Sequence, residues 1–88
     1  MENRISEVQI IPIKPKDGLI AFASILLDEK LYLSSIGLHR KLNGSGFRIT
    51  YPNKRVGNRN IDIFHPINRE LALEIEKTIL EKATKIFD

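Results

Sequence analysis

The sequence predicts a single α+β domain in which an antiparallel sheet of about five strands precedes one long C-terminal helix. Three observations predict it. Short apolar and β-branched runs, separated by turn residues, extend from residue 5 to residue 65. Apolar residues then recur at helical spacing from about residue 68 to residue 87. The chain has 88 residues, which is enough for one domain and no more.

The first two strands are predicted on either side of a turn at residues 15–18, Pro-Lys-Asp-Gly. Residues 5–14 are β-branched and extended in character. Their apolar residues change from even-numbered to odd-numbered positions after Ile10, and Pro12 lacks a backbone N–H. We therefore expect an edge strand or a bulge. Residues 19–27 are apolar at both parities, which favours a strand buried on both faces. The helix would cover one face and a second subunit the other.

The next strands are predicted around a second hairpin. A turn at residues 28–30 is followed by alternation over residues 31–38 that slips at Ser34 and Ser35. An inserted residue at this pair, a β-bulge, would restore a single apolar face. The Asn-Gly-Ser-Gly stretch at residues 43–46 then predicts a hairpin turn.

Phe47, Ile49 and Tyr51 alternate with Arg48 and Thr50, which gives one apolar and one solvated face. Phe47 and Tyr51 would offer base-stacking platforms if that face were exposed. We favour a core position beneath the helix for both rings, because an aromatic face of a small sheet is more often buried than exposed.

The end of the chain is predicted to contain a loop, a short strand and the helix. Residues 52–60 are polar and basic and contain Gly and Asn, which indicates a loop, and residues 61–64 indicate a short final strand. Asn68 is a good helix N-cap, and Glu70 lies in the positive first turn. An apolar stripe along residues 68–87 predicts an amphipathic helix packed on the sheet.

Positive charge is concentrated in the middle of the chain. The net charge is only +3 and the pI about 9.4. Between Lys30 and Ile61, however, there is no Asp or Glu, and the basic residues there are Lys30, Arg40, Lys41, Arg48, Lys54, Arg55 and Arg59. Lys and Arg gathered on one surface favour nucleic acid, because each neutralised phosphate releases condensed counterions. An ordinary solvated surface is the alternative, but such surfaces usually mix both signs.

The predicted basic loop holds the candidate binding residues. Arginine can contact phosphate or guanine edges in bidentate fashion, and asparagine can donate to phosphate or bases. The predicted nucleic-acid-binding residues are Lys54, Arg55, Arg59, Arg48 and Asn53, with Asn58 as a further polar contact.

Catalytic signals are weak. There is no Cys, and no Ser lies in a G-x-S-x-G setting. His39 lies beside basic residues, and we interpret it as one more polar group on a basic surface. His65 has Asp62 nearby to orient it, but a locally packed histidine is the simpler interpretation. We expect no enzymatic activity, cofactor or metal site. A hydrolase or transferase built on His65 and Asp62 stays as an alternative.

Composition also suggests location and assembly. The polar start does not resemble a signal peptide, and the longest apolar run, residues 19–27, is too short for a membrane span. We therefore expect a soluble, cytoplasmic protein without membrane contact. Without disulfides, so small a domain would most easily gain stability by burying apolar surface against a second copy, so we expect a homodimer.

Three stretches together carry a family resemblance: Ala-Ser-Ile-Leu-Leu-Asp at residues 23–28, Tyr-Pro-Asn-Lys-Arg at 51–55, and His-Pro-Ile-Asn at 65–68 leading into the helix. Their order and spacing resemble the septation protein SpoVG family, the stage V sporulation protein G of Gram-positive and some other bacteria. The resemblance extends over residues 5–83. Ser-Ile-Gly at residues 35–37 departs from the family's Asp-Ile-Arg-like pattern.

The resemblance implies a small dimeric α+β protein without enzymatic activity. Members bind DNA, and some bind RNA, and they influence sporulation, septum formation and gene expression. The family's basic P-x-K-R region falls on Pro52, Lys54 and Arg55, whereas Arg48 and Arg59 are added by proximity. The expected function is thus nucleic-acid-binding gene regulation. The alternative is an interaction adaptor in cell division or septum formation, whose basic loop docks an acidic partner.

Overall fold

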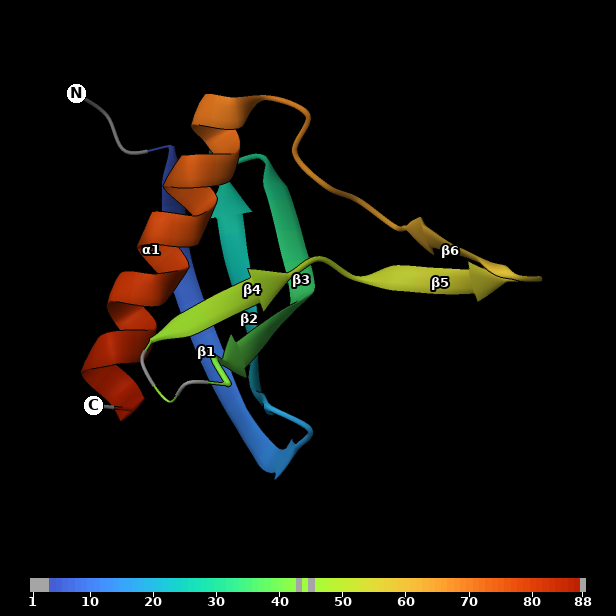
Figure 1. The fold of residues 1–88 in the computed structure, drawn as a ribbon. Coiled ribbons are helices and arrows are strands. Elements are labelled where there is room, and N and C mark those ends of the chain that lie inside the picture. Colours follow the sequence, from blue (N-terminus) through green and yellow to red (C-terminus); the bar gives the residue numbers. More distant parts are fainter. Residues whose placement is uncertain (1–3, 43, 45, 88) are drawn as a thin grey trace.

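The computed structural model describes residues 4–42, 44 and 46–87, which form strands followed by one helix (Figure 1). The elements are β1 (Ile5–Lys16), β2 (Leu19–Leu27), β3 (Leu31–Arg40), β4 (Phe47–Thr50), β5 (Asn53–Val56), β6 (Arg59–Asp62) and α1 (Arg69–Phe87). Strands β1 to β4 form an antiparallel sheet in chain order, and β5 and β6 form a separate two-stranded sheet. Helix α1 packs against β1 and β4. The predicted α+β class, an antiparallel sheet followed by a C-terminal helix, is confirmed.

The predicted loop at residues 52–60 is wrong, because most of it is strand. β5 and β6 pair in register from Val56 opposite Arg59 to Asn53 opposite Asp62. Gly57 opens the two-residue turn between them with a φ of 61°, as glycine does in the type II′ turns that match strand twist. The final strand therefore ends at Asp62, and the expected fifth strand is half of a separate ribbon.

The β-bulge in β3 lies where the alternation of apolar residues predicts it. Ala23 pairs with Ile36 but Ile25 pairs with Leu33, so β3 contains one extra residue. Ser35 lies there with a φ of 63°, which confirms the bulge predicted at Ser34 and Ser35.

The remaining turn predictions are mostly confirmed. β1 is an edge strand as predicted, although its register shifts between Ser6 and Gln9 and again after Pro12 rather than beside Ile10. The turn at residues 28–30 is also present. Arg40 pairs with Phe47 across the β3–β4 hairpin, whereas Asn43 and Ser45 of its turn lie outside the described residues.

The core lies between the sheet and α1. Its buried apolar side chains are Ile5, Ile20, Ala21, Ala23, Ile25, Ile36, Leu38, Phe47, Ile75, Ile79 and Ala83. Each fully buried isoleucine contributes about 1.5–3 kcal/mol relative to an exposed one. The ring of Phe47 lies 6.0 Å from that of Phe87 on α1, and Tyr51 contacts Phe64 edge to face at the same distance. Phe47 and Tyr51 are thus core or half-buried residues rather than exposed stacking platforms, as we favoured.

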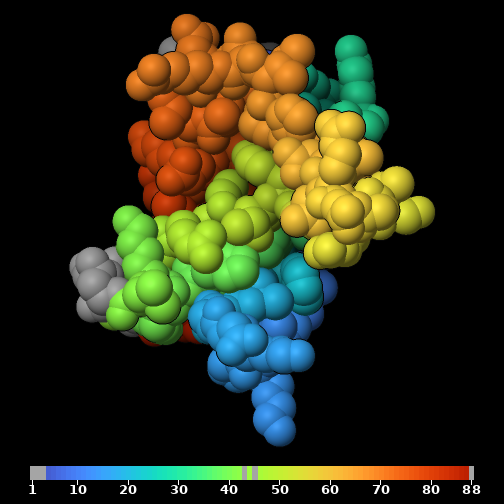
Figure 2. Space-filling model, turned by 45° about the vertical axis from the view of Figure 1, so that its right-hand side comes forward, coloured from blue at the N-terminus to red at the C-terminus, as the bar shows by residue number. Residues whose placement is uncertain are grey.

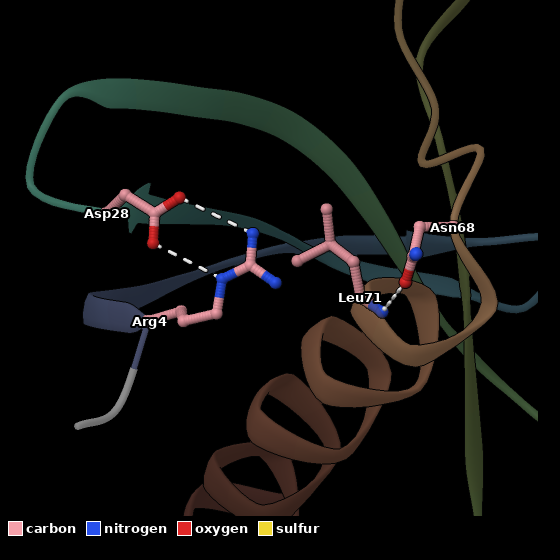
Figure 3. Close-up of polar contacts among 4 residues, drawn as sticks. All are labelled: Arg4, Asp28, Asn68 and Leu71. Carbon is pink, nitrogen blue, oxygen red and sulfur yellow. Dashed lines mark hydrogen bonds and ion pairs between the residues drawn. The ribbon is translucent and has the colours of Figure 1, made fainter. Parts of the chain in front are cut away.

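Two polar contacts fix the start of the helix and the N-terminal end of β1 (Figure 3). The backbone N–H of Leu71 donates to Asn68 Oδ1 at 2.9 Å, which confirms the predicted N-cap. Arg4 Nε lies 3.3 Å from Asp28 Oδ1 and joins β1 to the turn before β3. Both charged groups are about half exposed, so this ion pair contributes little to stability.

The sheet face opposite α1 is open. Ile11 on β1, Phe22 on β2 and Tyr32 on β3 border one shallow hollow there, and their side chains are 61%, 39% and 57% exposed. The Tyr32 hydroxyl donates to Ser24 Oγ at 2.9 Å within this hollow. We call this surface the open face. Within one chain, β2 is therefore covered on the helix side and only partly on the other, which is the face that a second subunit is predicted to cover.

Candidate nucleic-acid interface

The β5–β6 ribbon extends away from the rest of the protein (Figure 1). In the space-filling view it forms the yellow protrusion at the right of the molecule (Figure 2). All of its strand residues are exposed. In the part of the chain that the structure describes, its two strands pair only with each other, with Ile63 N–H donating to Pro52 O at 2.8 Å at the base. The ribbon therefore presents both of its faces to solvent.

The two faces of the ribbon differ in chemistry. Successive strand residues point to opposite faces, and cross-strand partners share a face. The pairs Arg55–Asn60 and Asn53–Asp62 form one face, and the pairs Lys54–Ile61 and Val56–Arg59 form the other. We call the first the polar face and the second the mixed face.

The structure brings together four of the five predicted binding residues. Asn53, Lys54, Arg55 and Arg59 all lie on the ribbon, although Lys54 and Arg59 belong to the mixed face and Asn53 and Arg55 to the polar face. Adjacent residues in the sequence motif therefore point in opposite directions. Asn58 lies in the turn at the tip.

Arg48 is the predicted residue that does not join them. It is exposed on β4, in the main sheet, where it pairs with His39 of β3.

The charges on the ribbon are mostly positive. Its strands contain three cations, Lys54, Arg55 and Arg59, and one carboxylate, that of Asp62. Asp62 lies at the ribbon's base, where its Oδ2 is 3.1 Å from Nδ1 of His65. Among the described residues, none of the three cations forms an ion pair, so each is free to contact an anion.

His39 differs from the surface group that its basic neighbours suggested. It is half-buried, its Nε2 lies 2.9 Å from Thr50 Oγ1, and its buried Nδ1 has no hydrogen-bond partner among the described residues. Burial lowers the pKa of His39, and the nearby charge of Arg48 lowers it further. His39 is therefore biased toward its neutral form, and it supplies a pH-sensitive group beside Arg48 that the sequence pattern did not reveal.

His65 and Asp62 do meet, as the sequence suggested. Their side chains are 51% and 46% exposed, and His65 also borders an apolar pocket of about 140 Å³ lined by residues such as Leu31, Tyr51 and Phe64. The polar groups of this pocket are few, and no serine, threonine or lysine of the described chain borders it. The pair has the geometry of a local contact at the ribbon's base.

In the described part of the structure, no helix is long and apolar enough to cross a membrane.

Comparison with known proteins places the chain in a family. No curated protein sequence matches the chain. A family model described as SpoVG matches residues 3–85, which is nearly the whole length, and the chain therefore belongs to the SpoVG family.

Proposed function

We propose that this protein is a nucleic-acid-binding regulator that acts as a homodimer, by binding rather than by catalysis. The β5–β6 ribbon is the observation that supports the proposal. It is exposed on both faces, and it has one carboxylate and three cations that form no ion pair with any residue the structure describes. Membership of the SpoVG family supports it, because the sequence resemblance to that family implies DNA binding and, in some members, RNA binding.

The expected binding energy is largely electrostatic. Each phosphate neutralised on duplex DNA gives a slope of about −0.9 in log affinity against log salt concentration. Lys54, Arg55 and Arg59 on one ribbon would together give a slope of about −3 if all three contacted phosphate, and about −2 if one of them contacted a base instead. A second copy would add a second ribbon, which raises both the slope and the avidity.

Catalysis receives no comparable support. The His65–Asp62 contact is half exposed, and its surroundings are apolar and aromatic rather than rich in groups that stabilise charge. Replacing His65 with alanine is expected to leave nucleic-acid affinity unchanged.

An adaptor that docks an acidic protein is the second candidate. The mixed face favours it, since Val56 and Ile61 are 52% and 47% exposed beside Lys54 and Arg59. Such a surface combines apolar contact with positive charge. Steeply salt-dependent binding to oligonucleotides would count against this candidate as the main function.

The first test is fluorescence anisotropy of a labelled duplex DNA and a single-stranded RNA at several salt concentrations. Wild type is expected to bind with a steep salt slope. Lys54→Ala/Arg55→Ala is expected to bind more weakly, with a shallower slope for duplex DNA.

Lys14→Ala/Lys16→Ala is the matched control, because it removes two exposed cations from β1, outside the ribbon. If both double variants lose affinity equally, binding depends on net charge and the ribbon is not the site. If wild type binds neither nucleic acid at low salt, the proposed function is wrong.

A further inference from the structure

The ribbon has dimensions that suit one groove of duplex DNA. Its strands of four residues extend about 13 Å at about 3.3 Å per residue, and paired strands lie about 4.8 Å apart. The B-DNA major groove is about 12 Å wide and about 8.5 Å deep, and it admits a two-stranded ribbon. The narrower minor groove, about 6 Å wide, does not offer this room. The ribbon's projection from the sheet leaves it free to enter (Figures 1 and 2).

The polar face carries side chains that can read base edges. Arginine donates two hydrogen bonds to O6 and N7 of guanine, and asparagine makes a bidentate pair with N6 and N7 of adenine. Arg55 and Asn60 are direct cross-strand partners, so their Cβ atoms lie about 5 Å apart. Asn53 lies two residues further from the tip on the same face. Two readers at this separation match neighbouring base pairs of one site.

When the polar face meets the base edges, the mixed face points away from them, and its long cationic side chains can bend toward the groove walls. Lys54 belongs to β5 and Arg59 to β6, so each strand of the ribbon contributes one long cationic side chain. The two walls of the major groove are lined by the phosphates of the two DNA strands. Asp62, the one carboxylate, lies at the base of the ribbon and contacts His65, away from the tip that would enter first.

We propose that the β5–β6 ribbon enters the major groove of duplex DNA, with Arg55 and Asn60 on base edges and Lys54 and Arg59 on phosphates. This inference rests on the proposed function and adds to it the form of nucleic acid, the groove and the division of roles. A-form RNA duplexes have a deep, narrow major groove that side chains cannot read. Sequence-dependent binding is therefore expected for duplex DNA and not for duplex RNA.

The test separates guanine N7 from phosphate. Duplexes enriched by wild type from a randomised DNA library give the bound sequence, which is then made with ordinary guanine and with 7-deazaguanine. This analogue lacks the N7 acceptor that Arg55 would use and leaves adenine, the base for Asn60, unchanged. Wild type is expected to bind the 7-deaza duplex at least about fivefold more weakly, since one bidentate base contact is worth about 1–3 kcal/mol.

The variants assign the roles. Arg55→Ala is expected to bind the two duplexes with nearly equal affinity, because the group that uses N7 is gone. Lys54→Ala is the matched control: it is expected to weaken binding to both duplexes by the same factor and to keep the N7 effect. Thermal unfolding of each variant is the check on folding; both side chains are exposed, so the melting temperature is expected to stay unchanged.

Three results would overturn the inference. Equal wild-type affinity for the ordinary and 7-deaza duplexes would show that no guanine N7 is read. Equal N7 sensitivity in Arg55→Ala and Lys54→Ala would remove the division of roles. Preference for single-stranded or duplex RNA over the enriched DNA would reject the groove while leaving nucleic-acid binding intact, whereas absence of all binding would reject the proposed function as well.

Discussion

At the scale of single residues, His39 and Gly37 of β3 form a tight site with Thr50 of β4. A Cβ on Gly37 would lie 2.6 Å from Thr50 Oγ1 and 3.1 Å from His39 Nε2, so only glycine leaves room for the contact between those two side chains. Gly37 thus admits a half-buried histidine beside Arg48.

The pKa of His39 makes stability depend on pH. Burial, aided by Arg48, lowers this pKa in the folded protein, whereas the unfolded chain keeps the ordinary value of about 6.5. Below that pH the unfolded state binds the proton more readily, so the free energy of unfolding is expected to be constant above about pH 7 and to fall as pH decreases through about 6.5. Urea unfolding of wild type and His39→Gln across this range measures the effect.

His65→Gln is the control for this pH dependence, because His65 is the second histidine of the chain and is half exposed. The His39→Gln profile should be flatter than wild type between about pH 5 and 7, and the His65→Gln profile should retain the wild-type decrease. Equal slopes in wild type and His39→Gln would show that His39 is not the group responsible.

At the scale of elements, those packed against the core could be predicted from the sequence, and the exposed ribbon could not. The helix, its Asn68 cap and the Ser34–Ser35 bulge could be predicted, because burial against the core imposes a period on those segments. The ribbon could not, because a strand exposed on both faces needs no alternation of apolar and polar residues. The candidate residues were found from charge, from asparagine side chains and from the family's P-x-K-R region. Their division between two faces depends on a pairing register that these signals do not contain.

The ribbon's order is expected to depend on its turn. Gly57 has a φ of 61°, and no atom lies within 4 Å of the position that a Cβ would occupy, so alanine there meets backbone strain and no clash. The strain of about 1–2 kcal/mol is large for an isolated two-stranded hairpin, which is marginal in water. Gly57→Ala should therefore increase hydrogen exchange of the amides in residues 53–62 and weaken nucleic-acid binding, while global thermal unfolding stays within about a degree, because the ribbon pairs with no strand of the main sheet.

Asn tolerates positive φ better than alanine, so Gly57→Asn should lie between wild type and Gly57→Ala in both exchange and affinity. A large drop in the global melting temperature of Gly57→Ala would mean that the ribbon contributes to the core. Unchanged exchange would mean that the turn does not limit the ribbon's order.

At the scale of the whole molecule, the open face and the ribbon together indicate how two copies would assemble. Ile11, Phe22 and Tyr32 leave an apolar surface uncovered on a domain whose core has only one helix over one sheet. Aromatic and aliphatic side chains with few charges are typical of the centre of subunit interfaces. We therefore expect the homodimer to form through the open face, which would leave both ribbons free to reach one nucleic acid.

Phe22→Asp is expected to yield a monomer in sedimentation equilibrium where wild type is a dimer, because it places a charge at the centre of this apolar surface. Ile67→Asp is the matched control: Ile67 is 95% exposed in the segment before α1, so the same charge there should leave the dimer intact. The monomer should keep a folded ribbon but bind duplex DNA with about half the salt slope, since one ribbon replaces two. A dimeric Phe22→Asp would place the interface elsewhere, and a monomer with an unchanged salt slope would show that only one ribbon of the dimer contacts DNA.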